Sequence, residues 1–96
     1  MKMKTMVLDC GDECSFKLAN GGVMKSAADM AKNFESMDDS TFYHHANESR
    51  NDFANWAKEA LKDEELAEEL QKAKDRKSAQ IAAMKRVTFL ISELSR

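Results

Sequence analysis

At 96 residues the chain has room for one hydrophobic core, and a chain this short buries only about two thirds of the surface that it exposes when unfolded. Hydrophobic residues make up 43% of it and charged residues 33%, with a net charge of −2, which excludes the sparse apolar content and one-sided charge of a disordered chain. No apolar run approaches the roughly 20 residues that span a bilayer, and the apolar stretch near the start is too short for a secretory signal, so we expect no membrane contact.

The position of the helix-breaking residues predicts a mainly α fold. The chain has no proline, and its three glycines lie in the first quarter, whereas Ala, Lys, Glu and Leu are plentiful afterwards. We therefore expect a single domain over residues 1–96, with an extended or hairpin segment over 1–22 and a helical part over 23–96. The expected architecture is a compact bundle of about five helices with a short N-terminal β-hairpin or extended segment.

The first segment has the pattern of an extended chain. Phe16 and Leu18 alternate with polar or small residues, and Asn20-Gly21 follows as a turn signal. Met6-Val7-Leu8 provides a candidate partner strand. Because a lone two-stranded hairpin is marginal in water, we expect the hairpin to lie against the helices.

Capping residues divide the remainder into helices. Behind each cap, apolar residues recur three and four positions apart, as they do on the buried side of an amphipathic helix. The expected caps, in chain order, are Ser26, one of the residues 38–40, one of Asn47, Ser49 and Asn51, then Asp63, and either Asp75 or Ser78.

The last predicted helix is the longest, and its apolar stripe has two interpretations. The stripe can complete the core, which is the usual role of such a pattern. It can also pair with a second copy of itself, because spacings of three, three, four and three residues resemble a short coiled-coil seam. In the second case the candidate interface of a homodimer consists of Ile81, Met84, Val87, Ile91 and Leu94.

Two cysteines and two histidines match the ligand inventory of a zinc site, but their spacing argues against one. Cys10 and Cys14 are spaced like zinc ligands, whereas His44 and His45 are adjacent and would point about 100° apart on a helix. We therefore expect no metal, no cofactor and two free thiols. Because two cysteines form no disulfide framework, a reducing cytoplasm is the expected location.

The sequence contains no signature of catalysis. It lacks a glycine-rich phosphate loop, and the acidic residues from Glu59 to Glu69 have the pattern of a solvated helix face. A core of this size can scarcely enclose a pocket that excludes water. We therefore expect no enzymatic activity.

Aromatic and short polar residues alternate between Phe42 and Trp56, across the predicted joint between two helices. In the interpretation that we favour, the polar residues cap helix ends while the aromatic rings close the core. In the alternative, the same residues line a polar pocket, with Trp56 as its floor, that holds a small ligand or a metal. The candidate binding residues are His45, Asn47, Asn51, Asp52 and Trp56.

Charge is spread unevenly along the chain. Residues 1–37 carry no net charge, residues 38–70 carry −7, and residues 71–96 carry +5. The basic end can attract phosphates, or it can pack beside an acidic surface of its own chain or of a second copy. No aromatic residues are interleaved with the basic ones to stack on bases, so nucleic acid is not the expected partner.

One pattern is fairly specific: Phe42-x-x-His45-x-Asn47-x-x-x-Asn51-Asp52-Phe53-Ala54-x-Trp56, followed by Asp63-x-x-Leu66-Ala67. It resembles an uncharacterised family of small helical domains of unknown function from archaea and bacteria. The likeness covers roughly residues 15–94 and leaves both cysteines outside. It implies a shared fold and a cytoplasmic setting, and it implies no activity.

These observations favour a small non-enzymatic module that binds a protein or a second copy of itself. The first alternative is a small-ligand or metal-sensing domain built on the residues between His45 and Trp56. The second is a nucleic-acid-associated protein that uses the basic C-terminal segment.

Overall fold

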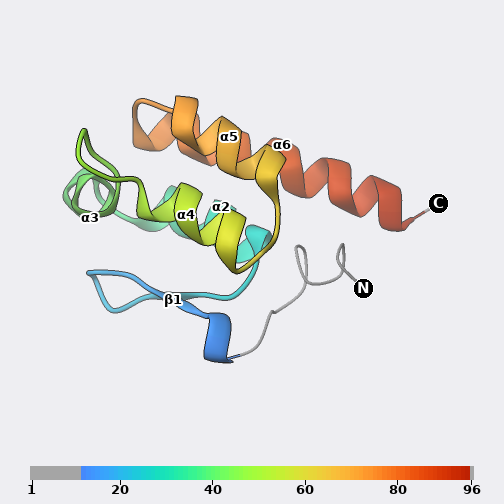
Figure 1. Ribbon diagram of the computed structural model, residues 1–96, viewed down its shortest axis with the longest axis horizontal. Coiled ribbons are helices and arrows are strands. Elements are labelled where there is room, and N and C mark those ends of the chain that lie inside the picture. Colours follow the sequence, from blue (N-terminus) through green and yellow to red (C-terminus); the bar gives the residue numbers. More distant parts are fainter. Residues whose placement is uncertain (1–11, 96) are drawn as a thin grey trace.

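The computed structural model describes residues 12–95, and Figure 1 shows them in three layers. The hairpin lies on one side, α2, α3 and α4 form the middle, and α5 and α6 cover the other side. This arrangement confirms the predicted bundle of about five helices with an N-terminal hairpin. The elements are a 3₁₀ turn (Asp12–Cys14), β1 (Phe16–Lys17), β2 (Val23–Met24), α2 (Ala27–Ser36), α3 (Asp39–His45), α4 (Asp52–Glu59), α5 (Glu64–Lys72) and α6 (Arg76–Leu94).

The hairpin extends further along the chain than the sequence suggested. β1 pairs antiparallel with β2, and Phe16 lies opposite Met24. Gly21 occupies the turn with a φ of 93°, a conformation that glycine adopts without strain. The prediction of helix from residue 23 onward is therefore wrong for β2, and the first helix begins at Ala27. The partner strand considered above, residues 6–8, lies outside the described residues.

Each of the helices α2 to α6 begins at a side chain that accepts a hydrogen bond from a backbone N–H of its first turn. Of the three candidates for the start of α4, Asn51 is the cap. Hydrogen bonds from Thr41 lower the pKa of the Asp38 carboxyl, and those from Ser78 lower the pKa of Asp75. The caps of the other four helices also confirm the prediction; they are Ser26, Asp38, Asp63 and Asp75.

An aromatic cluster around Phe53 of α4 joins the hairpin to the helices. Its ring stacks on Phe16 of β1 at 5.4 Å and on Phe42 of α3 at 5.6 Å between centroids. Phe34 of α2 meets the same ring edge to face at 4.9 Å. Such pairs add to the free energy gained from burying the rings themselves. Phe53 therefore connects four elements in one core.

A buried ion pair fixes α6 against the start of α5. Asp63 is 1% exposed, and its Oδ2 lies 2.8 Å from Nε of Arg86. Its Oδ1 accepts the N–H of Leu66 at 3.1 Å. The glutamates between residues 59 and 69 are exposed, as predicted, but the prediction of a solvated face is wrong for Asp63.

Most of the apolar stripe of α6 is turned away from the core. Ile81, Met84 and Ile91 are 46%, 50% and 49% exposed. The interpretation of the stripe as core is therefore wrong for these three residues. The buried side of α6 carries Ala79, Ala83 and Leu90 instead, and the two alanines let the helix lie close to α2.

Lys62, in the turn between α4 and α5, adopts the left-handed conformation with a φ of 58°. This conformation costs a non-glycine residue about 1–2 kcal/mol. We expect Lys62→Gly to raise the free energy of unfolding by about 0.5–1 kcal/mol, measured by urea denaturation. Lys58→Gly makes the same charge change inside α4 and should lower it by about 1 kcal/mol. Equal losses in both variants would contradict the expected strain at Lys62.

Candidate functional site

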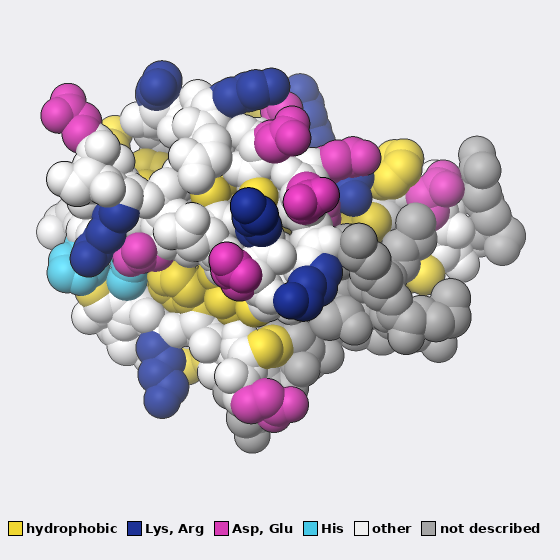
Figure 2. All heavy atoms as spheres, in the orientation of Figure 1, with side chains coloured by type: hydrophobic (Ala, Val, Ile, Leu, Met, Phe, Trp, Pro, Cys, Tyr) yellow, Lys and Arg dark blue, Asp and Glu magenta, His cyan; other side chains and the backbone are white. Residues whose placement is uncertain are grey.

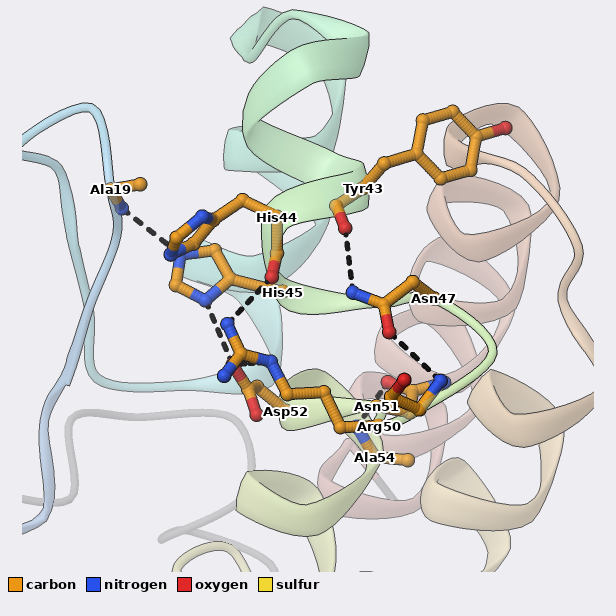
Figure 3. A network of polar contacts seen from close by, with 10 residues as sticks. Ala19, Tyr43, His44, His45, Asn47, Arg50, Asn51, Asp52 and Ala54 are labelled. Carbon is orange, nitrogen blue, oxygen red and sulfur yellow. Dashed lines mark hydrogen bonds and ion pairs between the residues drawn. The ribbon is translucent and has the colours of Figure 1, made fainter.

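His45 joins the hairpin to two helices. It ends α3, and 7% of its surface is exposed. Its Nε2 accepts the N–H of Ala19 at 3.0 Å, and its Nδ1 lies 3.0 Å from Oδ2 of Asp52 (Figure 3). Because Nε2 must present a lone pair to Ala19, the proton of the neutral ring is on Nδ1 and is donated to Asp52.

Asp52 receives a second partner from the loop before it. Nε of Arg50 lies 3.5 Å from Oδ2 of Asp52, and Arg50 also donates to the carbonyl of His44 at 2.8 Å. Asp52 is the first residue of α4, where the helix dipole favours a negative charge. The carboxylate is thus held by a histidine, an arginine and a helix start.

Two asparagines fix the loop between α3 and α4. Asn47 donates to the carbonyl of Tyr43 at 3.0 Å and accepts the N–H of Ser49 at 2.9 Å. Asn51 accepts the N–H of Ala54 at 3.0 Å, and its amide donates to the carbonyl of Leu70 at 3.0 Å. The second asparagine therefore ties the start of α4 to the end of α5.

Trp56 lies apart from this network, on the side of α4 that faces the hairpin. It is 8% exposed, and its Nε1 donates to the carbonyl of Cys14 at 2.6 Å. Its ring meets Phe16 edge to face at 5.9 Å. The structure thus brings His45 and Asp52 into direct contact, with Asn47 and Asn51 in the adjoining loop, and uses all five predicted residues in contacts within the chain.

A surface cavity of about 760 Å³ opens beside the same loop, next to the end of α5. Asn47 and Asn51 line it, together with Arg50 and Lys74, whereas His45 and Trp56 do not. Over residues 12–95, every buried side-chain nitrogen and oxygen already has a hydrogen-bond partner. The cavity therefore contains no buried polar group that calls for a ligand.

The cysteine chemistry differs from the expectation. Cys14 is disulfide-bonded, so the prediction of a free thiol is wrong at this position. Cys10 lies outside the described residues. In the described part of the chain, no three His, Cys, Asp or Glu side chains lie close enough together to hold a metal ion.

The second candidate surface, called the α6 face from here on, consists of Ile81, Met84, Thr88 and Ile91. Its residues are three, four and three positions apart and so share one side of the helix. Its first three residues line a groove of about 360 Å³ together with Lys85.

The α6 face differs from the predicted stripe at three positions. Val87 packs against the core, and Leu94, which is 38% exposed, lies at the edge of the α6 face. Thr88 is exposed on the α6 face itself. Thr88 was not predicted because the predicted stripe contains apolar residues only. The same heptad spacing nevertheless points to this position.

Comparison with known families shows a match to a family of unknown function. The model of a family of unknown function, DUF5752, matches residues 10–94. The match includes Cys10 and Cys14, which the resemblance drawn from the pattern had left outside. A search of curated proteins found no match, and a search of solved structures found none.

We expect Asn51→Ala to lower the free energy of unfolding by about 1–3 kcal/mol, because it removes both a helix cap and the bond to Leu70. Asn51→Ser is the matched control. Serine still caps a helix but is too short to reach Leu70, so a loss of about 1 kcal/mol is expected. Urea denaturation measures both, and equal losses would show that the cap contributes nothing.

The geometry of His45 also predicts its tautomer. At neutral pH, a long-range ¹⁵N–¹H correlation spectrum should show the neutral ring protonated at Nδ1 and unprotonated at Nε2. The exposed His44 provides an internal comparison. A proton on Nε2 of neutral His45 would contradict the hydrogen bond from Ala19.

Proposed function

We propose, from the premise that the chain belongs to the DUF5752 family of unknown function, that it is a small non-enzymatic interaction module. Its α6 face is the surface that contacts a protein partner. The observation that supports this proposal is the exposure of Ile81, Met84 and Ile91 on a helix whose opposite side is core. Contiguous exposed apolar side chains are typical of interaction surfaces.

The size of the α6 face sets the strength of the contact. Burying the exposed half of an Ile or Met side chain yields about 1 kcal/mol, so the three residues together yield about 3 kcal/mol. Association consumes at least about 4 kcal/mol of lost translational and rotational freedom. The exposed area of these three residues alone therefore does not offset the cost of association, so a contact on the α6 face has to include additional surface around them.

The contacts of the basic residues favour a protein partner over nucleic acid. Arg76 donates to Asp39 and to the carbonyl of Phe34, and Arg86 bonds Asp63 and Glu65. Figure 2 shows basic and acidic side chains intermingled over α4 and α5 on the visible side. Arginines that already neutralise carboxylates of their own chain contribute little to phosphate binding.

The ligand alternative has less support. His45 and Asp52 bond each other, and Trp56 bonds the backbone before β1. A ligand at these residues would have to replace interactions that hold the hairpin in place. We propose that the pattern from Phe42 to Trp56 is the structural signature of the family, and that the family extends over archaea and bacteria.

We also propose a cytoplasmic location, because two cysteines are too few for the disulfide framework of a small secreted domain. The disulfide of Cys14 is then expected to open in the reducing cytosol. Within residues 12–95, no helix is long and apolar enough to cross a lipid bilayer.

In-cell photo-crosslinking tests the proposed function. A photoreactive phenylalanine analogue replaces Met84 in one variant and Glu59, an exposed residue of α4, in a matched control. We expect irradiation of living cells to yield a protein adduct of higher mass from position 84 and not from position 59. Equal yields at both positions, or no adduct at position 84, would refute the proposal.

A further inference from the structure

We propose that protonation of His45 detaches the turn of the hairpin, Leu18 to Gly22, from α3, so that acid releases the turn and a higher pH restores it. This inference goes beyond the proposed function and concerns the hairpin rather than the α6 face. It is carried by a backbone hydrogen bond whose acceptor is a titratable nitrogen.

The ring of His45 attaches the turn through the lone pair of Nε2. Nδ1 carries the proton that is donated to Asp52, so Nε2 is left to accept the N–H of Ala19 at 3.0 Å. A second proton converts Nε2 into a donor, and two N–H groups would then face each other. No rotation of the ring removes this conflict, because an imidazolium has no acceptor in any orientation. Protonated His45 and an attached turn therefore exclude each other.

The contact on the other side of the ring survives protonation. Nδ1 donates to Asp52 from the neutral ring and from the charged ring alike, and Figure 3 shows the ring between Ala19 and Asp52. Asp52 thus holds the ring in place in both states, and the bond to Ala19 is the one that changes. Because the released turn goes with one additional bound proton, release is favoured as the pH falls.

Other charges beside the ring come from α3 and from the loop that follows it. The ring of His44 meets that of His45 edge to face at 4.9 Å, and Nε of Arg50 lies 3.5 Å from the Asp52 carboxylate. Positive charge on either group disfavours a proton on His45, whereas the carboxylate of Asp52 favours one. Asp52 lies 3.0 Å from the ring, so the protonated ring keeps a compensating negative charge in direct contact.

The contacts that the ring makes with the hairpin involve no charged group in the described part of the chain. They are the N–H of Ala19 and the ring of Phe16, whose centroid lies 5.0 Å from that of His45. Lys17 follows Phe16 on β1 and is exposed, because successive side chains of a strand point to opposite sides. The ring therefore forms no ion pair with the hairpin that would hold the turn once the hydrogen bond is lost.

The turn keeps its own shape without the ring. The N–H of Leu18 donates to the carbonyl of Gly22 at 2.8 Å, and the N–H of Gly21 donates to the carbonyl of Leu18 at 3.0 Å. The side chain of Asn20 accepts the N–H of Gly22 at 2.8 Å. Ala19 is exposed, so water can replace the imidazole as the acceptor of its N–H. The turn can thus detach as a unit, with no backbone group left unsatisfied.

Other contacts limit the release to the turn and make it reversible. Nε1 of Trp56 donates to the carbonyl of Cys14 at 2.6 Å, and Phe16 stacks on Phe53 at 5.4 Å between centroids. These groups do not titrate together with His45, so β1 stays on α4. Leu18 is 5% exposed in the attached state, and its burial favours the return of the turn when the proton leaves.

NMR spectroscopy of the purified chain tests the release. At about pH 8, a scalar coupling across the hydrogen bond should join the nitrogen of Ala19 to Nε2 of His45. As the pH falls to about 5, this coupling should disappear with the same midpoint as the protonation of the His45 ring. We expect exchange of the Ala19 amide with solvent, corrected for its intrinsic rate, to become about tenfold faster.

The amide of Ala54, which is bonded to Asn51 at 3.0 Å, is the internal control. It should stay protected over the same range, because its acceptor is a carboxamide oxygen. If Ala19 and Ala54 lose their protection together, acid unfolds the whole domain and the proposal is overturned. A ring that stays neutral to about pH 5 while the coupling persists would also overturn it.

Two variants separate the adjacent histidines. His45→Gln places a carboxamide oxygen near the position of Nε2, so Ala19 keeps an acceptor that takes up no proton in this range. His44→Gln removes the exposed neighbour. We expect the change at Ala19 to vanish in His45→Gln and to persist in His44→Gln, and the reverse result would overturn the proposal. Where His45→Gln does not fold, the midpoints measured in the natural chain and in His44→Gln decide.

Discussion

The hydrogen bond from Ala19 to His45 is the contact on which the arrangement of the first segment depends. Strands of two residues each are too short to persist alone in water, so the hairpin must be held by the helices. His45 binds its turn, and Trp56 binds the carbonyl of Cys14 at its other end. Between these two contacts the ring of Phe16 stacks on Phe53 and completes the aromatic core. The pattern from Phe42 to Trp56 therefore contains the residues that hold the hairpin against the helices. The hairpin could not fold by itself.

The sequence predicted best the features that depend on residues only three or four positions apart. Ser26, Asp38 and Asp75 cap helices through bonds to the N–H three positions later, so neighbouring residues were sufficient to find them. The choice of Asn51 among the candidates Asn47, Ser49 and Asn51 could not be made locally. Asn51 also bonds Leu70, 19 positions away, and no local pattern reports such a contact. The pairing of β1 with β2 was missed for a related reason, because two-residue strands show no periodicity.

Burial was harder to predict than helix formation. Asp63 was grouped with the exposed glutamates because its charge suits a helix start, whereas its burial depends on Arg86, 23 residues away. On α6 the larger apolar side chains had two interpretations, as core or as an interface, and the alanines were disregarded. α6 lies against α2, and a close approach of two helices selects small residues on the facing sides. Sequence patterns report that a stripe exists, but which stripe is buried depends on contacts between residues far apart in the chain, such as Arg86 and Asp63.

The orientation of α6 follows its buried ion pair rather than the size of its apolar side chains. An isolated domain gains most stability when its largest apolar side chains are buried, because the free energy of burial grows with apolar area. Here Ala79 and Ala83 are buried, while Ile81 and Met84 remain about half exposed. A rotation of α6 that buried the larger residues would carry Arg86 away from Asp63 and leave a buried carboxylate without its partner, which costs several kcal/mol. The ion pair thus locks α6 in the orientation that presents the α6 face.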